Sequence, residues 1–168
     1  MGGRDRGKLS KTVSITIAFV LSEFHFGVLA QTGDADGLKD RIAIQEKLLY
    51  AYAYAFDSKD CSGLSNLFTE DAVLEIGDVK RNGRAAIRQG CIERQNNVVG
   101  NIKTHHNMTN IVFDKLTPSR AETRTYVVIT WQKAGDQTIN VQVVGVYHDV
   151  IVKSGDGRWL FKERRQTD

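Results

Sequence analysis

The sequence predicts an α+β domain in which helices pack on one concave, strongly curved sheet. Segments with helical periodicity dominate up to about residue 98, and extended segments rich in Thr, Val and Ile dominate after residue 104. Short turns separate the extended segments, which is typical of an antiparallel meander. Helices followed by a meander favour one sheet covered by helices, and 168 residues suffice to bury the core of a single domain.

Residues 1–30 have the pattern of a signal peptide, so we expect a secreted or periplasmic protein. Four basic residues precede an apolar run, Val13–Leu21, and Val28–Ala30 resembles the site that a signal peptidase cleaves, with Gln31 as the mature start. The run is too short to form a stable membrane span. Glu23 interrupts the apolar segment, so an uncleaved anchor and a start codon assigned too far upstream are the alternatives.

The domain itself is expected at residues 40–168, after a flexible segment at 31–39 that is polar and rich in Gly and Asp. A long helix is predicted from Asp40 to Lys59, because apolar residues recur there at intervals of three and four. Its apolar positions are Ile44, Leu48, Tyr52 and Ala55. The elements expected next are a helix at 62–68, a strand at 72–76, a turn at 78–83 and a helix at 84–98, in which Gly90 is a weak point.

Four longer strands are predicted in the second part of the chain. They span 104–115, 121–131, 138–153 and 159–163. Turns rich in Gly, Pro, Ser and Asp lie between them, at 117–119, 134–136 and 154–157.

Two cysteines, Cys61 and Cys91, lie in the expected mature part. In an oxidising compartment they would form a disulfide that closes a loop, worth about 3 kcal/mol in the chain-entropy model. The alternative is two separate buried thiols that behave as small hydrophobic side chains. Their spacing fits no metal-binding or redox motif.

The formal net charge of +3 does not indicate a protein that binds nucleic acid. Residues 1–30 hold four basic residues against two acidic ones, so the rest of the chain is close to neutral and has no basic stripe. The sequence also has no metal-binding or nucleotide-binding motif, so we expect a protein that works without a metal or an organic cofactor.

A stripe of polar side chains follows the predicted first helix. Tyr50, Tyr54 and Asp57 are spaced four and three apart, so they share one face. Phenols and a carboxylate suit the wall of a pocket, in which the rings pack a ligand and the polar groups hydrogen-bond to it. The alternatives are core tyrosines with hydroxyls at the surface and an aspartate that ends this helix or caps the next one.

Two adjacent histidines, His105 and His106, point to opposite faces of the strand at 104–115. The face of His106 also holds Met108, Asn110 and Val112. A carboxylate that orients an imidazole is the smallest unit that performs proton transfer on a bound organic molecule. Asp57 and one of the histidines therefore indicate a small-molecule pocket. The alternative for an inward histidine is a hydrogen-bonded core residue.

Six segments in the same order resemble the SnoaL-like branch of the nuclear transport factor 2-like superfamily. They are 44–60, 67–73, 83–87, 106–110, 145–149 and 157–164. Two members are similar at the proposed site, scytalone dehydratase and hexachlorocyclohexane dehydrochlorinase. The dehydratase has Tyr-Asp-Ser-Lys-Asp where this chain has residues 56–60, which begin with Phe56, and both enzymes carry a strand histidine in the place of His106.

The resemblance implies a cone-shaped sheet closed by three helices, a cystatin-like α+β barrel with a ligand cavity. It implies that Asp57 orients His106 and that His106, rather than His105, is the general base. The ligand is expected to be a small hydrophobic or polycyclic organic molecule. The residues expected to contact it are Tyr50, Tyr54, Met108, Asn110, Tyr126 and Arg164.

The function we expect is that of an exported lyase, of dehydratase or dehydrohalogenase type, or an isomerase. Phe56 replaces a tyrosine of the dehydratase, and the second histidine of that enzyme has no counterpart on the strand at 121–131, so scytalone dehydration itself is not implied. One alternative is a non-catalytic module that binds a ligand or dimerises. Another is an accessory protein similar to polyketide cyclases or hydroxylases.

A homodimer is expected, because cone domains of this type pair through the outer face of the sheet. Trp131 and the β-branched run at 127–129 indicate such an apolar face. The alternative is that the helices cover this face completely.

Overall fold

The computed structural model describes Gly2, residues 32–97 and residues 101–168. The expected signal peptide at 1–30 lies outside the described residues, apart from Gly2, and so does Val98 at the expected end of the third helix. Gln31–Asp168 forms one compact unit.

One long helical rod begins this unit. It consists of α1 (Thr32–Ile44), a wider π-helical turn, η1 (Gln45–Leu49), and α2 (Tyr50–Asp57). The flexible segment expected at 31–39 must be corrected, because helix α1 already begins at Thr32. In η1 the backbone N–H of Tyr50 donates to the carbonyl of Gln45, and such turns often lie near functional sites. In α2, which follows this turn in the chain, Tyr52 is buried, whereas Tyr50 and Tyr54 are exposed.

A short helix and a β-hairpin follow. The Asp60 side chain accepts a hydrogen bond from the Gly63 backbone at 2.8 Å and so caps α3 (Cys61–Ser65). Strands β1 (Phe68–Ile76) and β2 (Val79–Asn82) pair in antiparallel fashion. The turn expected at 78–83 is therefore a strand in large part. Helix α4 (Arg84–Asn97) begins directly after this hairpin.

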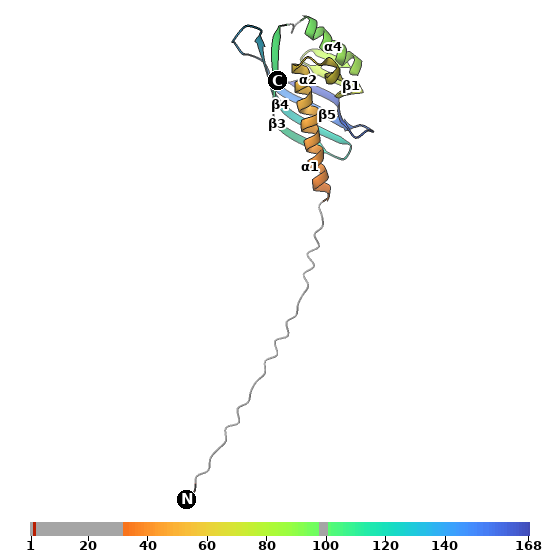
Figure 1. The fold of residues 1–168 in the computed structure, drawn as a ribbon. Helices are drawn as coiled ribbons and strands as arrows, with labels where there is room; N and C mark the ends of the chain where they lie inside the picture. Colours follow the sequence, from red (N-terminus) through yellow and green to blue (C-terminus); the bar gives the residue numbers. More distant parts are fainter. Residues whose placement is uncertain (1, 3–31, 98–100) are drawn as a thin grey trace. The chain divides into compact units, whose positions relative to one another are not determined.

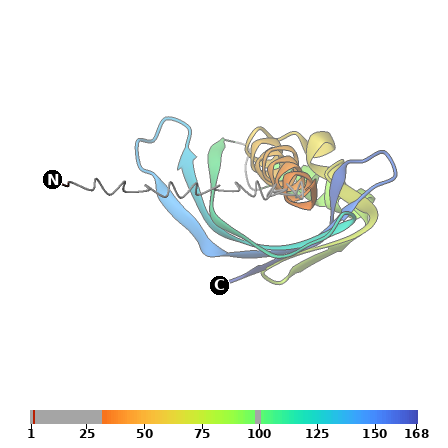
Figure 2. The same cartoon turned by 90° about the horizontal axis from the view of Figure 1, so that it is seen from below.

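The remaining strands complete a six-stranded sheet in the order β2-β1-β6-β5-β4-β3. They are β3 (Ile102–Leu116), β4 (Arg120–Lys133), β5 (Asn140–Lys153) and β6 (Trp159–Thr167). The sheet is mixed because β1 and β6 run parallel, while the other neighbours are antiparallel. It stays open, with β2 and β3 at its edges. Figure 2 shows the strands curving around the helical rod. The expected α+β class with a curved sheet is confirmed.

The inner face of the sheet and the helices share one core. Its largest buried side chains include Ile44, Leu48, Tyr52, Phe68, Tyr147 and Phe161. Strand alternation places Val127 and Ile129 in this core. Of the three residues expected on the exposed face at 127–129, only Val128 therefore lies on the outer side of the sheet, where it is half-buried. Across residues 32–97 and 101–168, no helix is long and apolar enough to cross a membrane.

Candidate active site

The end of α2 and the start of β3 bring Asp57 and His106 into direct contact. Oδ1 of Asp57 lies 2.7 Å from Nδ1 of His106. The other carboxylate oxygen, Oδ2, accepts the backbone N–H of His106 at 2.8 Å. The hydroxyl of Thr104 donates to Oδ1 at 2.9 Å. Three contacts to the same strand therefore fix the carboxylate relative to the imidazole.

Strand alternation determines which histidine takes part. Thr104 and His106 point to the inner face of β3 and both contact Asp57, whereas His105 is exposed. The side chain of His106 is 1% exposed. The rings of Phe56 and Tyr52 lie against the imidazole, with centroids 4.5 Å and 6.1 Å away.

Asp57 is held in its ionised form. Burial by itself would raise the pKa of Asp57, but hydrogen bonds from the ring and backbone of His106 and from Thr104 lower it below the ordinary value of 3.8. An ionised carboxylate only accepts hydrogen bonds, so Nδ1 of His106 carries a proton, and in the neutral form of the ring Nε2 has the lone pair. The contribution of Asp57 to stability is complete above the unfolded-state pKa and is lost as the pH falls through the lower folded-state pKa.

His106 lines a cavity of about 410 Å³ between α2, α4 and the sheet, a volume that suits a small organic molecule. The apolar part of the wall includes Phe56, Leu74, Ile76, Ile87, Ile129 and Val143. The polar part includes Tyr52, Arg81, Glu93, Arg94, Tyr147 and Gln166. Asp57 is not among the lining residues, so it acts on the cavity through the imidazole.

None of the six residues expected to contact the ligand lines this cavity. Tyr54 is 78% exposed, and Tyr50 and Tyr126 are also exposed. Asn110 is exposed at an irregular position of β3, where its φ is 51°. Met108 is partly buried against the core, but it does not line the cavity. The expectations for Tyr50 and Tyr54 must be corrected, because the stripe of α2 that faces the sheet runs through Tyr52. The structure also does not place Met108, Asn110 or Tyr126 in the wall of this cavity.

The family of the domain follows from a comparison with known protein families. The model of the SnoaL-like domain matches residues 36–165, which is most of the chain. The chain belongs to the SnoaL-like family. The resemblance stated from the sequence is thereby confirmed. No curated protein sequence matches the chain at a significant level.

Solved structures share the fold of this SnoaL-like domain. A protein of unknown function from Mycobacterium tuberculosis is 23% identical with a TM-score of 0.72, over 82% of this chain and 76% of that one. A candidate scytalone dehydratase from Novosphingobium aromaticivorans is 25% identical with a TM-score of 0.66, over 80% and 89%. A nuclear transport factor 2-like protein with a cystatin-like fold, from the same organism, is 20% identical with a TM-score of 0.71, over 84% and 90%. The cystatin-like fold is thereby confirmed.

A buried ion pair lies behind the cavity of the SnoaL-like domain. Arg164 of β6 donates to both carboxylate oxygens of Asp149 on β5, at 2.8 Å each. Its guanidinium carbon lies 4.1 Å from the ring centre of Tyr52 and 4.3 Å from that of Tyr147. Arg164 was expected to contact the ligand, but it does not line the cavity. It instead packs against the two tyrosines that do.

Tyr52 and Tyr147 bring neutral phenols to the cavity. Burial raises the pKa of Tyr52 above its ordinary value of 10.0, although the guanidinium of Arg164 acts in the opposite direction. Burial also raises the pKa of Tyr147 well above its ordinary value. Both hydroxyls therefore stay protonated, and because they are hydrogen-bonded to each other, one of the two is left to donate a hydrogen bond to a ligand. The alternation of Tyr147, Asp149 and Ile151 along β5 is a sequence signal that indicates their shared inner face.

Helix α4 and strand β2 supply charged wall residues that the sequence analysis did not identify. Nη2 of Arg81 lies 3.1 Å from Oε2 of Glu93. Gly90 makes room for this pair, since a Cβ at Gly90 would fall 2.2 Å from Nε of Arg81. The weak point expected in the helix thus has a packing role. Among the residues that the structure describes, no cluster of His, Cys, Asp or Glu side chains could hold a metal ion.

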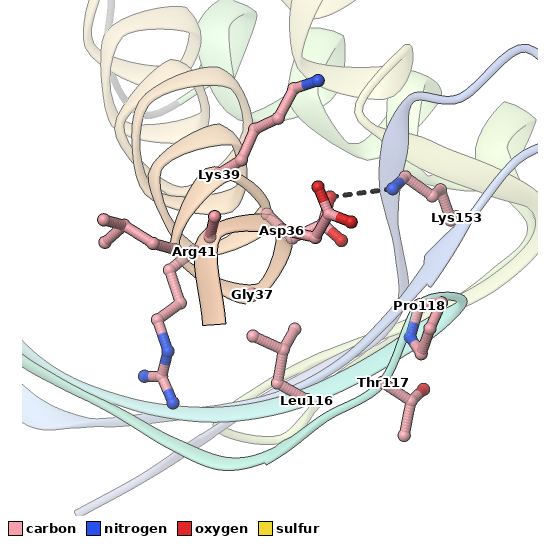
Figure 3. Close-up of a pocket in the computed structure, with 11 residues that line it drawn as sticks. Asp36, Gly37, Lys39, Arg41, Leu116, Thr117, Pro118 and Lys153 are labelled. Atoms are coloured by element: carbon pink, nitrogen blue, oxygen red, sulfur yellow. Dashed lines mark hydrogen bonds and ion pairs between the residues drawn. The ribbon is translucent and has the colours of Figure 1, made fainter. Parts of the chain in front are cut away.

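A second hollow of about 1030 Å³ lies between α1 and the β3–β4 turn (Figure 3). Its charged groups include Lys153, whose Nζ lies 2.7 Å from Oδ1 of Asp40. The same oxygen accepts a hydrogen bond from the Trp159 indole at 3.0 Å. Asp40 thus joins α1 to the sheet. His106 and Asp57 are not in the lining of this hollow, so the smaller cavity is the candidate active site.

Proposed function

We propose that this SnoaL-like domain is a lyase or isomerase in which His106 removes a proton from a carbon atom of a small organic molecule. The observation that carries the proposal is the contact of 2.7 Å between Asp57 and Nδ1 of a histidine that lines a largely apolar cavity. The likeness to a candidate scytalone dehydratase, at 25% identity, favours the same class of chemistry. The reaction would need only acid-base groups of the protein.

The proposed step begins with Nε2 of His106, which takes the proton of a C–H bond. The electron pair of that bond forms a double bond to the adjacent carbon, whose leaving group departs with its own electron pair. The imidazolium is stabilised by the carboxylate of Asp57 and can return the proton to the leaving group. In an isomerase the same proton would return to a different carbon. Tyr52 or Tyr147 can donate a hydrogen bond to the departing group.

The expected non-catalytic function remains a second candidate, because most of the cavity wall is apolar and would also suit a binding protein. A binding protein would return a ligand copurified from the cell unchanged after long incubation. A lyase or isomerase would convert it, and the difference is measurable by mass spectrometry.

We expect the change Asp57→Asn to reverse the tautomer of His106. The backbone N–H of His106 donates to Oδ2 and can only donate, so the amide would keep its oxygen at that position and place its NH₂ where Oδ1 faces Nδ1, and the hydroxyl of Thr104 would rotate to accept. Nδ1 would then be the acceptor and Nε2 would carry the proton, which removes the general base. The ¹⁵N chemical shifts of the ring, measured above the pH at which imidazole titrates, report the tautomer.

Asp60→Asn is the matched control, because Asp60 belongs to the same sequence motif but caps α3. It should leave the His106 tautomer unchanged. A wild-type imidazole protonated at Nε2, or a proton that stays on Nδ1 in Asp57→Asn, would contradict the proposed mechanism.

We propose that the domain is exported. The expected signal peptide and the disulfide between Cys61 and Cys91 support this, because disulfides persist in oxidising compartments. The mature N-terminus, determined by mass spectrometry on protein from the exported fraction, tests the proposal. An N-terminus at Met1 in that fraction would contradict cleavage.

We propose that the domain forms a homodimer through the outer face of β4 and β5. Tyr126 faces outward opposite Val146, and Val128 lies opposite Val144, which is 68% exposed. A second copy of this face would cover these side chains.

Val144→Lys is expected to shift the protein to monomers in sedimentation velocity. Ile42→Lys, on an exposed position of α1, is the control and should not. A monomeric wild type would refute the proposal.

A further inference from the structure

Arg94, on the last turns of α4, is a cation in the wall of the active-site cavity. Its Nε is buried and has no hydrogen-bond partner among the residues that the structure describes. Its guanidinium carbon lies 5.3 Å from the ring centre of Phe56. A buried donor of an arginine without a partner is costly, so it indicates a place where a ligand can supply the acceptor.

The carboxylate next to Arg94 in the sequence is already engaged. Oε2 of Glu93 lies 3.1 Å from Arg81, and Oε1 accepts a hydrogen bond from Gln89 at 3.4 Å. Asp57 accepts its hydrogen bonds from His106 and Thr104. In the described part of the chain, no carboxylate lies within ion-pair distance of Arg94. The charge of Arg94 is therefore the one that the cavity wall leaves unbalanced.

Arg94 and His106 flank the same aromatic ring. The imidazole centre lies 4.5 Å from the ring centre of Phe56, and the guanidinium carbon lies 5.3 Å from it. Both side chains line the cavity. A planar molecule that rests in this part of the cavity can therefore present an anionic group to Arg94 and a C–H bond to Nε2 of His106.

We propose that the cavity selects an organic anion, with an apolar body against Phe56 and a carboxylate or other oxyanion bound by Arg94. Arg94 is then a specificity-determining residue. The proposal deepens the proposed function by naming the substrate class, and it rests on that function only for the reaction that follows binding. A charge-assisted hydrogen bond to a guanidinium in a largely apolar cavity favours an anion over a neutral molecule of the same shape.

Three naphthalene probes of the same shape test this selection by isothermal titration calorimetry on the full-length protein. They are naphthoate, its neutral amide and the cationic naphthylmethylammonium ion. We expect naphthoate to bind about tenfold more tightly than the amide and the cation to bind most weakly. Equal affinities for the amide and the anion, or no binding of naphthoate, would overturn the proposal.

Variants assign the selection to Arg94. Arg94→Gln should abolish the preference for naphthoate, and Arg94→Glu should favour the cationic probe. Arg88→Gln is the matched control, because Arg88 is an exposed arginine of the same helix, and it should keep the wild-type preference. A preference that survives in Arg94→Gln would overturn the assignment. If Arg94→Gln does not fold, Arg94→Lys should retain the preference, and its loss there would overturn a charge-based selection.

The proposed general base and the proposed anionic substrate are tested by different measurements, so either can be contradicted without the other. The His106 tautomer decides whether a general base is formed, and it does not depend on the charge of the ligand. The order of the probe affinities decides the substrate class, and it is measured without turnover.

Discussion

Arg164→Met is expected to lower the free energy of unfolding by about 3–5 kcal/mol. The change leaves the carboxylate of Asp149 buried without its counterion, and both side chains are 0% exposed in the folded protein. Among the residues that the structure describes, the hydroxyl of Thr123, at 3.4 Å, is then the remaining side-chain donor to that carboxylate. Arg164 also packs against the rings of Tyr52 and Tyr147, so its loss should disturb the wall of the candidate active-site cavity as well.

Urea unfolding followed by circular dichroism measures this loss, and Arg124→Met is the matched control. Arg124 also pairs with an aspartate through two hydrogen bonds of 2.7 Å, to Asp114, but the two side chains are 51% and 41% exposed. A solvated pair of this kind contributes less than about 1 kcal/mol. Similar losses in the two variants would show that burial does not govern the energetics of the Arg164 pair.

A double variant separates the buried charge from the lost packing. Arg164→Met combined with Asp149→Leu removes both charges, so it should recover a large part of the stability lost in Arg164→Met alone. A double variant that is less stable than the single one would instead assign the loss to packing against the aromatic rings.

The second large effect is expected from the disulfide. Changing both Cys61 and Cys91 to serine should lower the free energy of unfolding by about 3–4 kcal/mol, since the bond closes a loop with a sequence separation of 30. The bond joins α3 to α4, so it anchors the helix that carries Arg94. In the unfolded chain the bond removes conformations that the serine variant regains.

Urea unfolding with and without a thiol reductant measures this effect within one protein. The wild type should lose stability on reduction, and the double serine variant should show no response to the reductant. A wild type that is equally stable in both conditions would contradict the predicted contribution. Free-thiol titration of the oxidised protein checks that the bond is present, because the two cysteines are the whole complement of the chain.

Much of this protein follows from local patterns in its sequence. The alternation of side chains in residues 104–115 places one histidine inward, and the resemblance to SnoaL-like proteins selects His106. The position of Asp57 at the end of the first helix follows from helical periodicity in the same way. These features depend on neighbours within a few residues, so they are readable without a structure. The family model then confirms the fold to which they belong.

The cavity wall depends on contacts between distant parts of the chain. Tyr50 and Tyr54 share a helical stripe with Asp57, yet Tyr52 faces the sheet, because the aromatic core formed with Phe68 and Phe161 takes that side of the helix. The pairing of Arg164 with Asp149 arises because β5 and β6 are neighbours in the sheet. Arg94 becomes a cavity residue because α4 packs against α3 and the hairpin of β1 and β2 and so borders the cavity that Phe56 of α2 also lines.

The sequence by itself determined the α+β class, the order of the elements and the acid and histidine of the candidate site. The tertiary structure alone decided that Cys61 meets Cys91, that Arg164 is an internal ion-pair partner, and that Arg94 lies in the cavity wall with a buried Nε that has no hydrogen-bond partner among the described residues. The physical reason is the distance along the chain over which each kind of interaction acts. Periodicity and alternation report which way a side chain points from its own element, whereas the partner it meets is set by the packing of elements far apart in the chain.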